Sequence, residues 1–183
     1  TTRQTPSCHG SGAGIWVKLA LLKITRLDAG SITFEKESCR LSALIGHALS
    51  ELTTRAQKEG KTLLMEGSPD ASLICDPAWT AEALANLVKN ALDHTHKAGI
   101  IRIAWDVSPA AVRISITDNG DGIAPEDIPH IFKRFYRSRK SQDTQGAGLG
   151  LSLSKSIIEG QDGILSVRSV PGTETTFTLL FPL

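Results

Sequence analysis

Two asparagines, Asn86 and Asn90, lie one turn apart on a helix predicted over residues 77–96. At about 100° per residue they share one face, roughly opposite an apolar stripe. Asparagine is a weak helix former, so two of them in mid-helix reduce helix stability without an evident structural benefit. Their carboxamide oxygens suit a hard cation such as Mg²⁺, which prefers oxygen ligands and few protein groups. A solvated polar face is the structural alternative.

A glycine-punctuated turn, Asp118–Ile123, follows a predicted strand. Its glycines, Gly120 and Gly122, let a planar ring come close to the backbone. The carboxylate of Asp118 can accept a hydrogen bond from an exocyclic amine, and Ile123 would form an apolar wall. Because Asn-Gly and Asp-Gly are common turn dipeptides, a simple tight turn is the structural alternative.

A second glycine-rich stretch, Gly146–Leu151, leads directly into a predicted helix. It matches neither G-x-G-x-x-G nor the P-loop pattern, so it indicates neither a Rossmann site nor a P-loop. Flexible glycines that expose amides just before a helix N-terminus do suit a phosphate group. A hinge is the structural alternative.

A cluster of cations precedes this stretch and is interleaved with aromatic residues. Beside a glycine-rich loop, such a cluster fits a triphosphate better than a nucleic acid. The chain has 20 Lys and Arg against 19 Asp and Glu, a net charge of +1, which argues against a nucleic-acid partner. The cations are Lys133, Arg134, Arg137, Arg139 and Lys140.

Together, in this order, these stretches resemble the ATP-binding catalytic domain of bacterial sensor histidine kinases, a family of the GHKL ATPase superfamily. The likeness covers about residues 37–183, and Ile24–Gly30 resembles the end of the family's dimerisation helix. The matching segments are Asn86–Thr95 (asparagine box), Asp118–Ile123 (first glycine box), Ile131–Arg137 (phenylalanine box), Gly146–Leu151 (second glycine box) and Gly172–Pro182 (terminal strand motif).

The resemblance implies a two-layer α/β sandwich of the Bergerat type, which binds Mg-ATP between the asparagine helix and a mobile lid. It implies that Asn90 ligates Mg²⁺ with support from Asn86, and that Asp118 accepts a hydrogen bond from the adenine amine. Arg137 would approach the terminal phosphate, and Thr176 would contact adenine through water. The other implied ATP-binding residues are Gly120, Gly122, Ile123, Gly146, Gly148, Leu149 and Gly150; Phe132 and Phe135 are expected to pack.

The sequence departs from the family pattern at a few positions. Asp93 stands where the family often has Lys, so a cation that could reach phosphate is missing, and Glu174 occupies the third-glycine position. GHKL hydrolases place a water-activating Glu at the position of Asn86, so hydrolysis should be slow. A GHKL-type ATPase, or a catalytically weakened nucleotide-gated interaction module, is the alternative function.

The family's phosphoacceptor is a histidine followed by an acid and soon by a proline, and none of the 5 histidines fits. We therefore interpret the chain as a fragment that transfers the γ-phosphoryl group of ATP to a histidine on a separate dimerisation domain. The implied partners are that domain and a response regulator, within a homodimeric parent. The implied location is the cytoplasmic side of a membrane-anchored parent, without membrane contact by the fragment.

The elements that must position these motifs follow from apolar spacing. Two hairpins among the predicted strands favour an α+β fold, with helices on one face of a mixed, mostly antiparallel sheet. We predict helices over 16–28, 40–59, 77–96 and 149–159, a helical piece near 127–135, and strands at 62–65, 72–75, 101–105, 112–116, 164–168 and 175–181.

Length and composition fit an ordinary domain: 183 residues, of which 40% are hydrophobic and 21% charged. The cysteines Cys8, Cys39 and Cys75 lack metal-ligand spacing and are interpreted as free thiols. No apolar run approaches the roughly 20 residues of a membrane helix. We expect residues 1–14 to be a flexible leader, 15–36 the end of the dimerisation helix with its linker, and 37–183 the ATP-binding domain.

Overall fold

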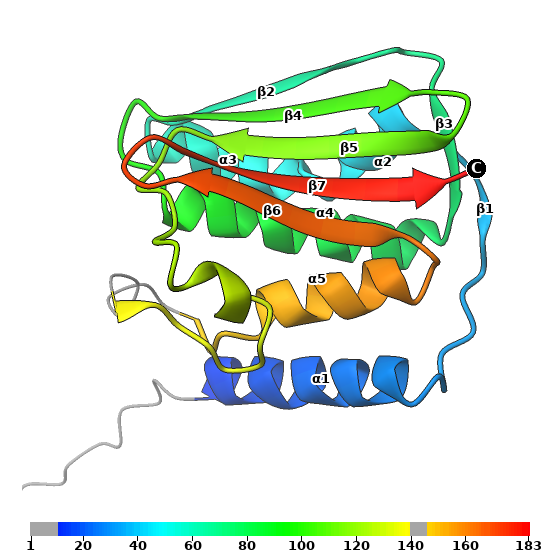
Figure 1. The fold of residues 1–183 in the computed structure, drawn as a ribbon, viewed down its shortest axis with the longest axis horizontal. Coiled ribbons are helices and arrows are strands. Elements are labelled where there is room, and N and C mark those ends of the chain that lie inside the picture. Colours follow the sequence, from blue (N-terminus) through cyan, green and yellow to red (C-terminus); the bar gives the residue numbers. More distant parts are fainter. Residues whose placement is uncertain (1–10, 140–145) are drawn as a thin grey trace, which may run out of the picture.

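The computed structural model describes residues 11–139 and 146–183. A five-stranded mixed sheet, in the order β2-β4-β5-β7-β6, is covered on one face by helices (Figure 1). This arrangement confirms the predicted fold class. The sheet strands are β2 (Thr62–Gly67), β4 (Ile100–Val107), β5 (Ala111–Asp118), β6 (Ile164–Val170) and β7 (Glu174–Pro182).

Both predicted hairpins are present, since β4 pairs antiparallel with β5 and β6 pairs antiparallel with β7. Strand β2 instead pairs in parallel with β4, so strand pairing is not local throughout. The connection between them passes through β3 (Ser72–Cys75) and helix α4 (Pro77–Asp93). A strand that was not predicted, β1 (Glu37–Arg40), pairs with β3 in a separate two-stranded sheet.

The core lies between the sheet and the helices α4 and α5 (Gly150–Glu159), because buried residues of β4, β5 and β7 alternate with more exposed ones. The predicted apolar stripe of α4 is fully buried against this sheet, with Leu84, Leu87, Val88 and Ala91 at most 1% exposed. The sheet contributes Ile101, Ile103, Val112, Ile114, Ile116, Phe177 and Leu179.

Helix α4 begins as predicted, because Asp76 Oδ1 accepts a hydrogen bond from the Trp79 amide (3.2 Å) and Pro77 occupies the first turn. It ends at Asp93, before the predicted residue 96. The helix predicted over 40–59 is two helices, α2 (Leu41–Ala48) and α3 (Ser50–Lys58), because Leu49 leaves helical geometry (φ −103°, ψ 3°).

Near residues 127–135 the structure has only the short 3₁₀ turn η1 (Ile128–His130). The predicted helical piece is therefore present only as this single turn, and the rest of the stretch is not helical. Phe135 adopts a positive φ of 62°, a backbone conformation that does not continue a right-handed helix.

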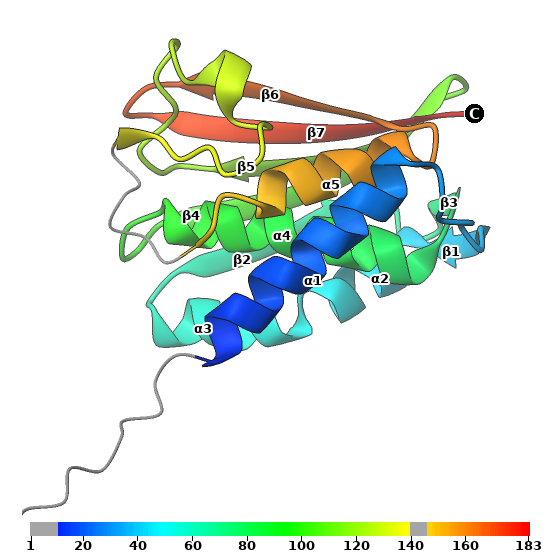
Figure 2. The ribbon, with the colours of Figure 1, turned by 90° about the horizontal axis from the view of Figure 1, so that it is seen from below.

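Helix α1 (Ser11–Asp28) crosses over α4 and α5 on the side away from the sheet (Figure 2). It begins within the stretch 1–14 that we expected to be a leader; residues 1–10 lie outside the described part of the chain. An ion pair between Lys23 and Glu82 (2.8 Å) joins α1 to α4. Within the described residues, no helix has the length and apolarity needed to cross a bilayer.

Candidate functional site

Helices α4 and α5 run antiparallel across the sheet. Ser154 Oγ donates a hydrogen bond to the Ala83 carbonyl (3.2 Å), and Gln161 Nε2 donates one to Thr80 Oγ1 (3.1 Å). Residues from the middle of α5 and from just beyond its end thus contact successively earlier residues of α4. The first turn of α5 therefore lies level with the turn of α4 that carries Asn86 and Asn90.

A cavity opens where these two helices meet the end of β5. All the predicted ATP-binding residues except Gly120 and Thr176 line it, which brings motifs far apart in the sequence into one site. The predicted residues that line the cavity are Asn86, Asn90, Asp118, Gly122, Ile123, Arg137, Gly146, Gly148, Leu149 and Gly150.

Asp118 ends β5 with a carboxylate that is only 3% exposed. Burial raises the pKa of Asp118 from its ordinary value of 3.8 to about 6, although its hydrogen bond from the Gly120 amide (2.9 Å) opposes the rise. The nearby charges of Asp121 and Glu174 add to it. The cavity therefore holds a buried carboxylate whose ionised form would gain from another donor.

Gly120 does not line the cavity, but it sets the shape of this turn. A Cβ at this position would lie 2.2 Å from the carbonyl oxygen of His94. Only glycine permits this close approach, which holds the turn after β5 against the end of α4.

Thr175, and not the predicted Thr176, faces the cavity. Thr175 lies directly opposite Asp118 in the β5–β7 register, so both side chains point to the same face of the sheet. Thr176 points to the other face, where its hydroxyl is 2.9 Å from that of Thr117. The strand alternation thus places Thr175, one residue before the predicted Thr176, on the cavity side of the sheet.

The opposite end of the cavity suits an anion. Asn86 Nδ2 is buried and has no hydrogen-bond partner within the described residues. Within the described residues no side chain caps the first turn of α5, and the amides at a helix N-terminus suit an anionic acceptor. Asn86 and the first turn of α5 therefore line the same part of the cavity from two helices.

The lining residues fit a magnesium–nucleotide complex better than a metal bound by protein alone. In the ranges that the structure describes, no group of three or more His, Cys, Asp or Glu side chains could hold a metal ion. A Mg²⁺ ion at this end would rely on a carboxamide oxygen such as that of Asn90, on phosphate oxygens and on water, as is usual for Mg²⁺.

The phenylalanine box is fastened to the second glycine box. The Phe135 amide donates a hydrogen bond to the Gly148 carbonyl (2.9 Å), and Gly148 has a φ of 71° that favours glycine. Phe132 packs edge-on against Phe177, as expected, but Phe135 is 55% exposed, so its predicted packing role was wrong. Residues 140–145, including Lys140 of the cationic cluster, lie outside the described part of the chain.

Several lining residues were not predicted, among them His94, Lys89 and Trp16. Burial lowers the pKa of His94, which favours a neutral imidazole at pH 7. Lys89 precedes Asn90 by one residue and so lies at the edge of the same helix face, a signal that helical periodicity could have given. The Lys89 ammonium is 5.7 Å from the centroid of the Trp16 ring on α1.

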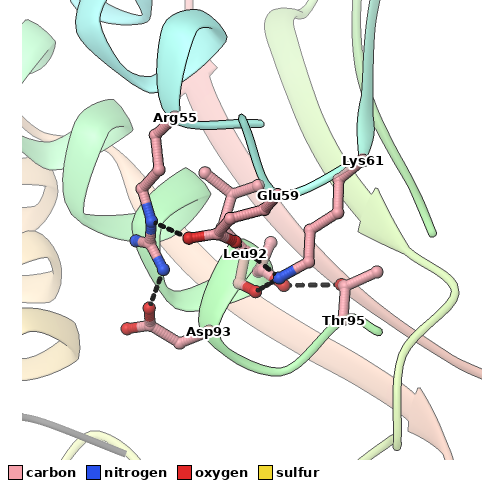
Figure 3. A network of polar contacts seen from close by, with 7 residues as sticks. Arg55, Glu59, Lys61, Leu92, Asp93 and Thr95 are labelled. Carbon is pink, nitrogen blue, oxygen red and sulfur yellow. Dashed lines mark hydrogen bonds and ion pairs between the residues drawn. The ribbon is translucent and has the colours of Figure 1, made fainter. Parts of the chain in front are cut away.

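Asp93, the acidic substitute for the family's lysine, lines the cavity and is held by a cation from another helix (Figure 3). Arg55 Nη2 lies 2.6 Å from Asp93 Oδ1, and Arg55 Nε lies 2.7 Å from Glu59. Lys61 bonds to Glu59 and to the Leu92 carbonyl, both at 2.7 Å. The network thus ties α3 to the end of α4, and hydrogen bonds from Lys61 and Arg55 lower the pKa of Glu59.

Comparison with known proteins gives a matching family model over residues 75–183, described as "Histidine kinase-, DNA gyrase B-, and HSP90-like ATPase". The sensor-like histidine kinase SenX3 of Mycobacterium tuberculosis is 32% identical over 164 residues, which cover 88% of this chain and 40% of SenX3. The non-motile and phage-resistance protein of Caulobacter vibrioides is 32% identical over 96% of this chain and 22% of its own length. The chain thus spans less than half the length of these relatives.

Solved structures show the same fold. The catalytic domain of the histidine kinase ThkA superposes with a TM-score of 0.72 at 25% identity, over 81% of this chain and 98% of that one. The histidine kinase AdeS of Acinetobacter baumannii gives a TM-score of 0.78 at 21% identity, over 92% of this chain and 77% of AdeS. With the family model spanning more than half of the sequence, the chain belongs to the histidine kinase-, DNA gyrase B- and HSP90-like ATPases, with the ATP-binding catalytic fold of sensor histidine kinases.

Proposed function

We propose that this domain binds Mg-ATP in the cavity between α4 and α5 and transfers the γ-phosphoryl group to a histidine on a dimerisation domain. The observation that carries the proposal is the division of the cavity into two ends. A buried carboxylate lies at one end, and the Asn86 carboxamide and the N-terminus of α5 lie at the other. ATP complements both ends, because its adenine amine donates a hydrogen bond and its phosphate oxygens accept hydrogen bonds.

At the adenine end, Asp118 accepts a hydrogen bond from the exocyclic amine, and Thr175 lies beside it on β7. Gly122 and Ile123 form the wall against the ring. An apolar wall with a single directional acceptor is typical of a site that selects one planar base.

At the phosphate end, Asn86 and the first-turn amides of α5 donate to phosphate oxygens. Asn90 offers its carboxamide oxygen to Mg²⁺, which would neutralise charge that develops on the transferred group. Arg137 lies within reach of the terminal phosphate, since it lines the same cavity. Phosphoryl transfer depends mainly on positioning and charge stabilisation, so these residues suffice for the role of this domain.

The accepting imidazole is itself the nucleophile, so the domain needs no base of its own. Its ring nitrogen forms the new N–P bond as the bond to the bridging oxygen of ADP breaks. We propose that the acceptor lies outside this chain and that α1 is the end of the dimerisation helix. A response regulator would then take the phosphoryl group from the parent protein. That parent would be a membrane-anchored homodimer with this domain on the cytoplasmic side.

The test is a titration of the protein with an ATP analogue, with and without Mg²⁺. Binding is measured as the heat released and as the shift in unfolding temperature. We expect the wild type to bind and Mg²⁺ to strengthen binding. Asn90→Ala should lose the Mg²⁺-dependent part while keeping its unfolding temperature. Gln57→Ala, which removes an exposed carboxamide from α3 outside the cavity, is the matched control.

A second measurement separates the kinase from its alternatives. Mixed with a family dimerisation domain that carries the acceptor histidine, the wild type should label that domain from γ-labelled ATP with an acid-labile phosphoryl group. Rapid steady-state release of phosphate would favour a hydrolase instead. Binding of ATP without labelling or hydrolysis would favour a nucleotide-gated interaction module.

A further inference from the structure

Lys89 lies at the phosphate end of the cavity, on the turn of α4 that carries the two asparagines. The adenine end of the cavity lies beside the C-terminal end of α4, because the Asp121 amide, in the turn after β5, donates a hydrogen bond to the His94 carbonyl (3.2 Å). Lys89 is five residues before His94, about 7.5 Å back along the helix axis. That direction leads toward the first turn of α5, where the helix N-terminus favours an anion.

The charges of the lining residues make this lysine important. Four carboxylates line the cavity, but the permanent cations among the described lining residues are only Lys89 and Arg137. The carboxylates are Asp93, Asp118, Asp121 and Asp127. A triphosphate carries several negative charges, so a cavity with this lining needs every cation that can reach the phosphates.

Position 93 cannot supply such a cation, because Asp93 is acidic and its Oδ1 is held by Arg55. The Lys89 ammonium, in contrast, contacts the face of the Trp16 ring at 5.7 Å. Both partners are exposed, and a cation–π contact at an exposed site is weak compared with a charge-assisted bond to phosphate. The ammonium can therefore exchange one partner for the other.

We propose that Lys89 binds the nucleotide's phosphates, in the role that the residue at position 93 does not fill here, and that Trp16 competes for the same ammonium group. The proposal rests on the proposed function. It has a structural consequence, because Trp16 belongs to α1. The affinity of the cavity for ATP then depends on whether α1 stays docked over α4.

The test compares the affinities of wild type and variants for Mg-ATP and for adenosine, measured by calorimetry. Lys89→Met should bind Mg-ATP about 10-fold to 100-fold more weakly, as expected for loss of a charge-assisted bond, and adenosine within about twofold of wild type. Lys89→Arg should restore most of the affinity for Mg-ATP. Lys97→Met, which removes the same charge from an exposed residue outside the cavity, should bind like the wild type.

The competition is tested by Trp16→Leu, which should bind Mg-ATP about twofold to fivefold more tightly than wild type. The gain should vanish in the Lys89→Met background. Equal affinities of Lys89→Met and Lys97→Met for Mg-ATP would overturn the role of Lys89, and so would an equal loss for ATP and adenosine. Weaker binding by Trp16→Leu would overturn the competition. If the wild type binds no Mg-ATP, the proposed function itself fails. The comparisons among variants, in contrast, test only the roles of Lys89 and Trp16.

Discussion

Replacing Asp118 by asparagine should make the protein more stable while weakening its affinity for ATP. The Asp118 carboxyl is 3% exposed, and burial raises its pKa from 3.8 to about 6. At about 1.36 kcal/mol per pKa unit, the ionised carboxylate costs the folded state about 3 kcal/mol at neutral pH. A carboxamide of the same shape removes this cost and can still accept the hydrogen bond from the Gly120 amide.

The pH dependence of the stability difference shows whether the Asp118 carboxylate causes it. Because the pKa of Asp118 is raised in the folded state, its contribution to stability is largest below about pH 4, the ordinary pKa of the group, and is lost as pH rises through about 6. Asp118→Asn does not titrate, so its advantage over wild type should be about 1–3 kcal/mol at pH 8, or about 2–10 °C in unfolding temperature. The advantage should shrink as pH falls from 6 toward 4.

Thermal unfolding of both proteins across pH 4–8, each with and without ATP, measures both effects. The other titrating groups are common to the two proteins, so the difference isolates Asp118. We expect Asp118→Asn to bind ATP about 10-fold to 100-fold more weakly, because its amide group would face the adenine amine donor to donor. An asparagine variant that is less stable at pH 8, or whose advantage is constant with pH, would refute the argument.

Three further substitutions test other parts of the site. Thr175→Val should weaken nucleotide binding measured by calorimetry, whereas Thr176→Val, on the opposite face of β7, should leave it unchanged; the reverse order would restore the sequence-based assignment. Gly148→Ala should weaken ATP binding and lower the unfolding temperature, because a Cβ would lie 2.7 Å from the Tyr136 carbonyl; Gly46→Ala on α2, outside the cavity and with no neighbour within 4 Å of its Cβ, serves as control. Leu87→Ala should cost about 2–5 kcal/mol in denaturant unfolding, since Leu87 is 0% exposed; a loss below 1 kcal/mol would contradict its place in the core.

The sequence predicted those parts of the fold that depend on local patterns. Alternating residues gave both hairpins, and a capped apolar stripe gave the start of α4. The parallel pairing of β2 with β4 and the β1–β3 sheet were not predicted, because they join segments far apart in sequence. The break at Leu49 was missed for a related reason: the apolar spacing continues through it, so periodicity gives no signal there.

The candidate site shows the same contrast between local sequence patterns, which could be predicted, and contacts between distant segments, which could not. All the predicted ATP-binding residues except Gly120 and Thr176 line the cavity, because each lies in a distinctive local sequence. The motif points to Thr176, whereas Thr175 lines the cavity, because the face on which a strand residue lies depends on its register with β5, which the motif does not encode. Trp16 could not be predicted at all, since its place at the cavity depends on the docking of α1 across α4.

The acidic residue at position 93 shows why a departure from a motif must be judged with its surroundings. Alone, Asp93 would place an unpaired carboxylate in the lining of the cavity. Arg55 from α3 lies against it at 2.6 Å, and Glu59 and Lys61 extend the contact into an alternating series of charges. The negative charge of Asp93 is therefore balanced from outside the cavity, and its side chain helps to hold the end of α4 in place. Because the balancing cation is committed to this network, the phosphate end must take its positive charge from elsewhere, and among the described residues Lys89 is placed to supply it together with Arg137.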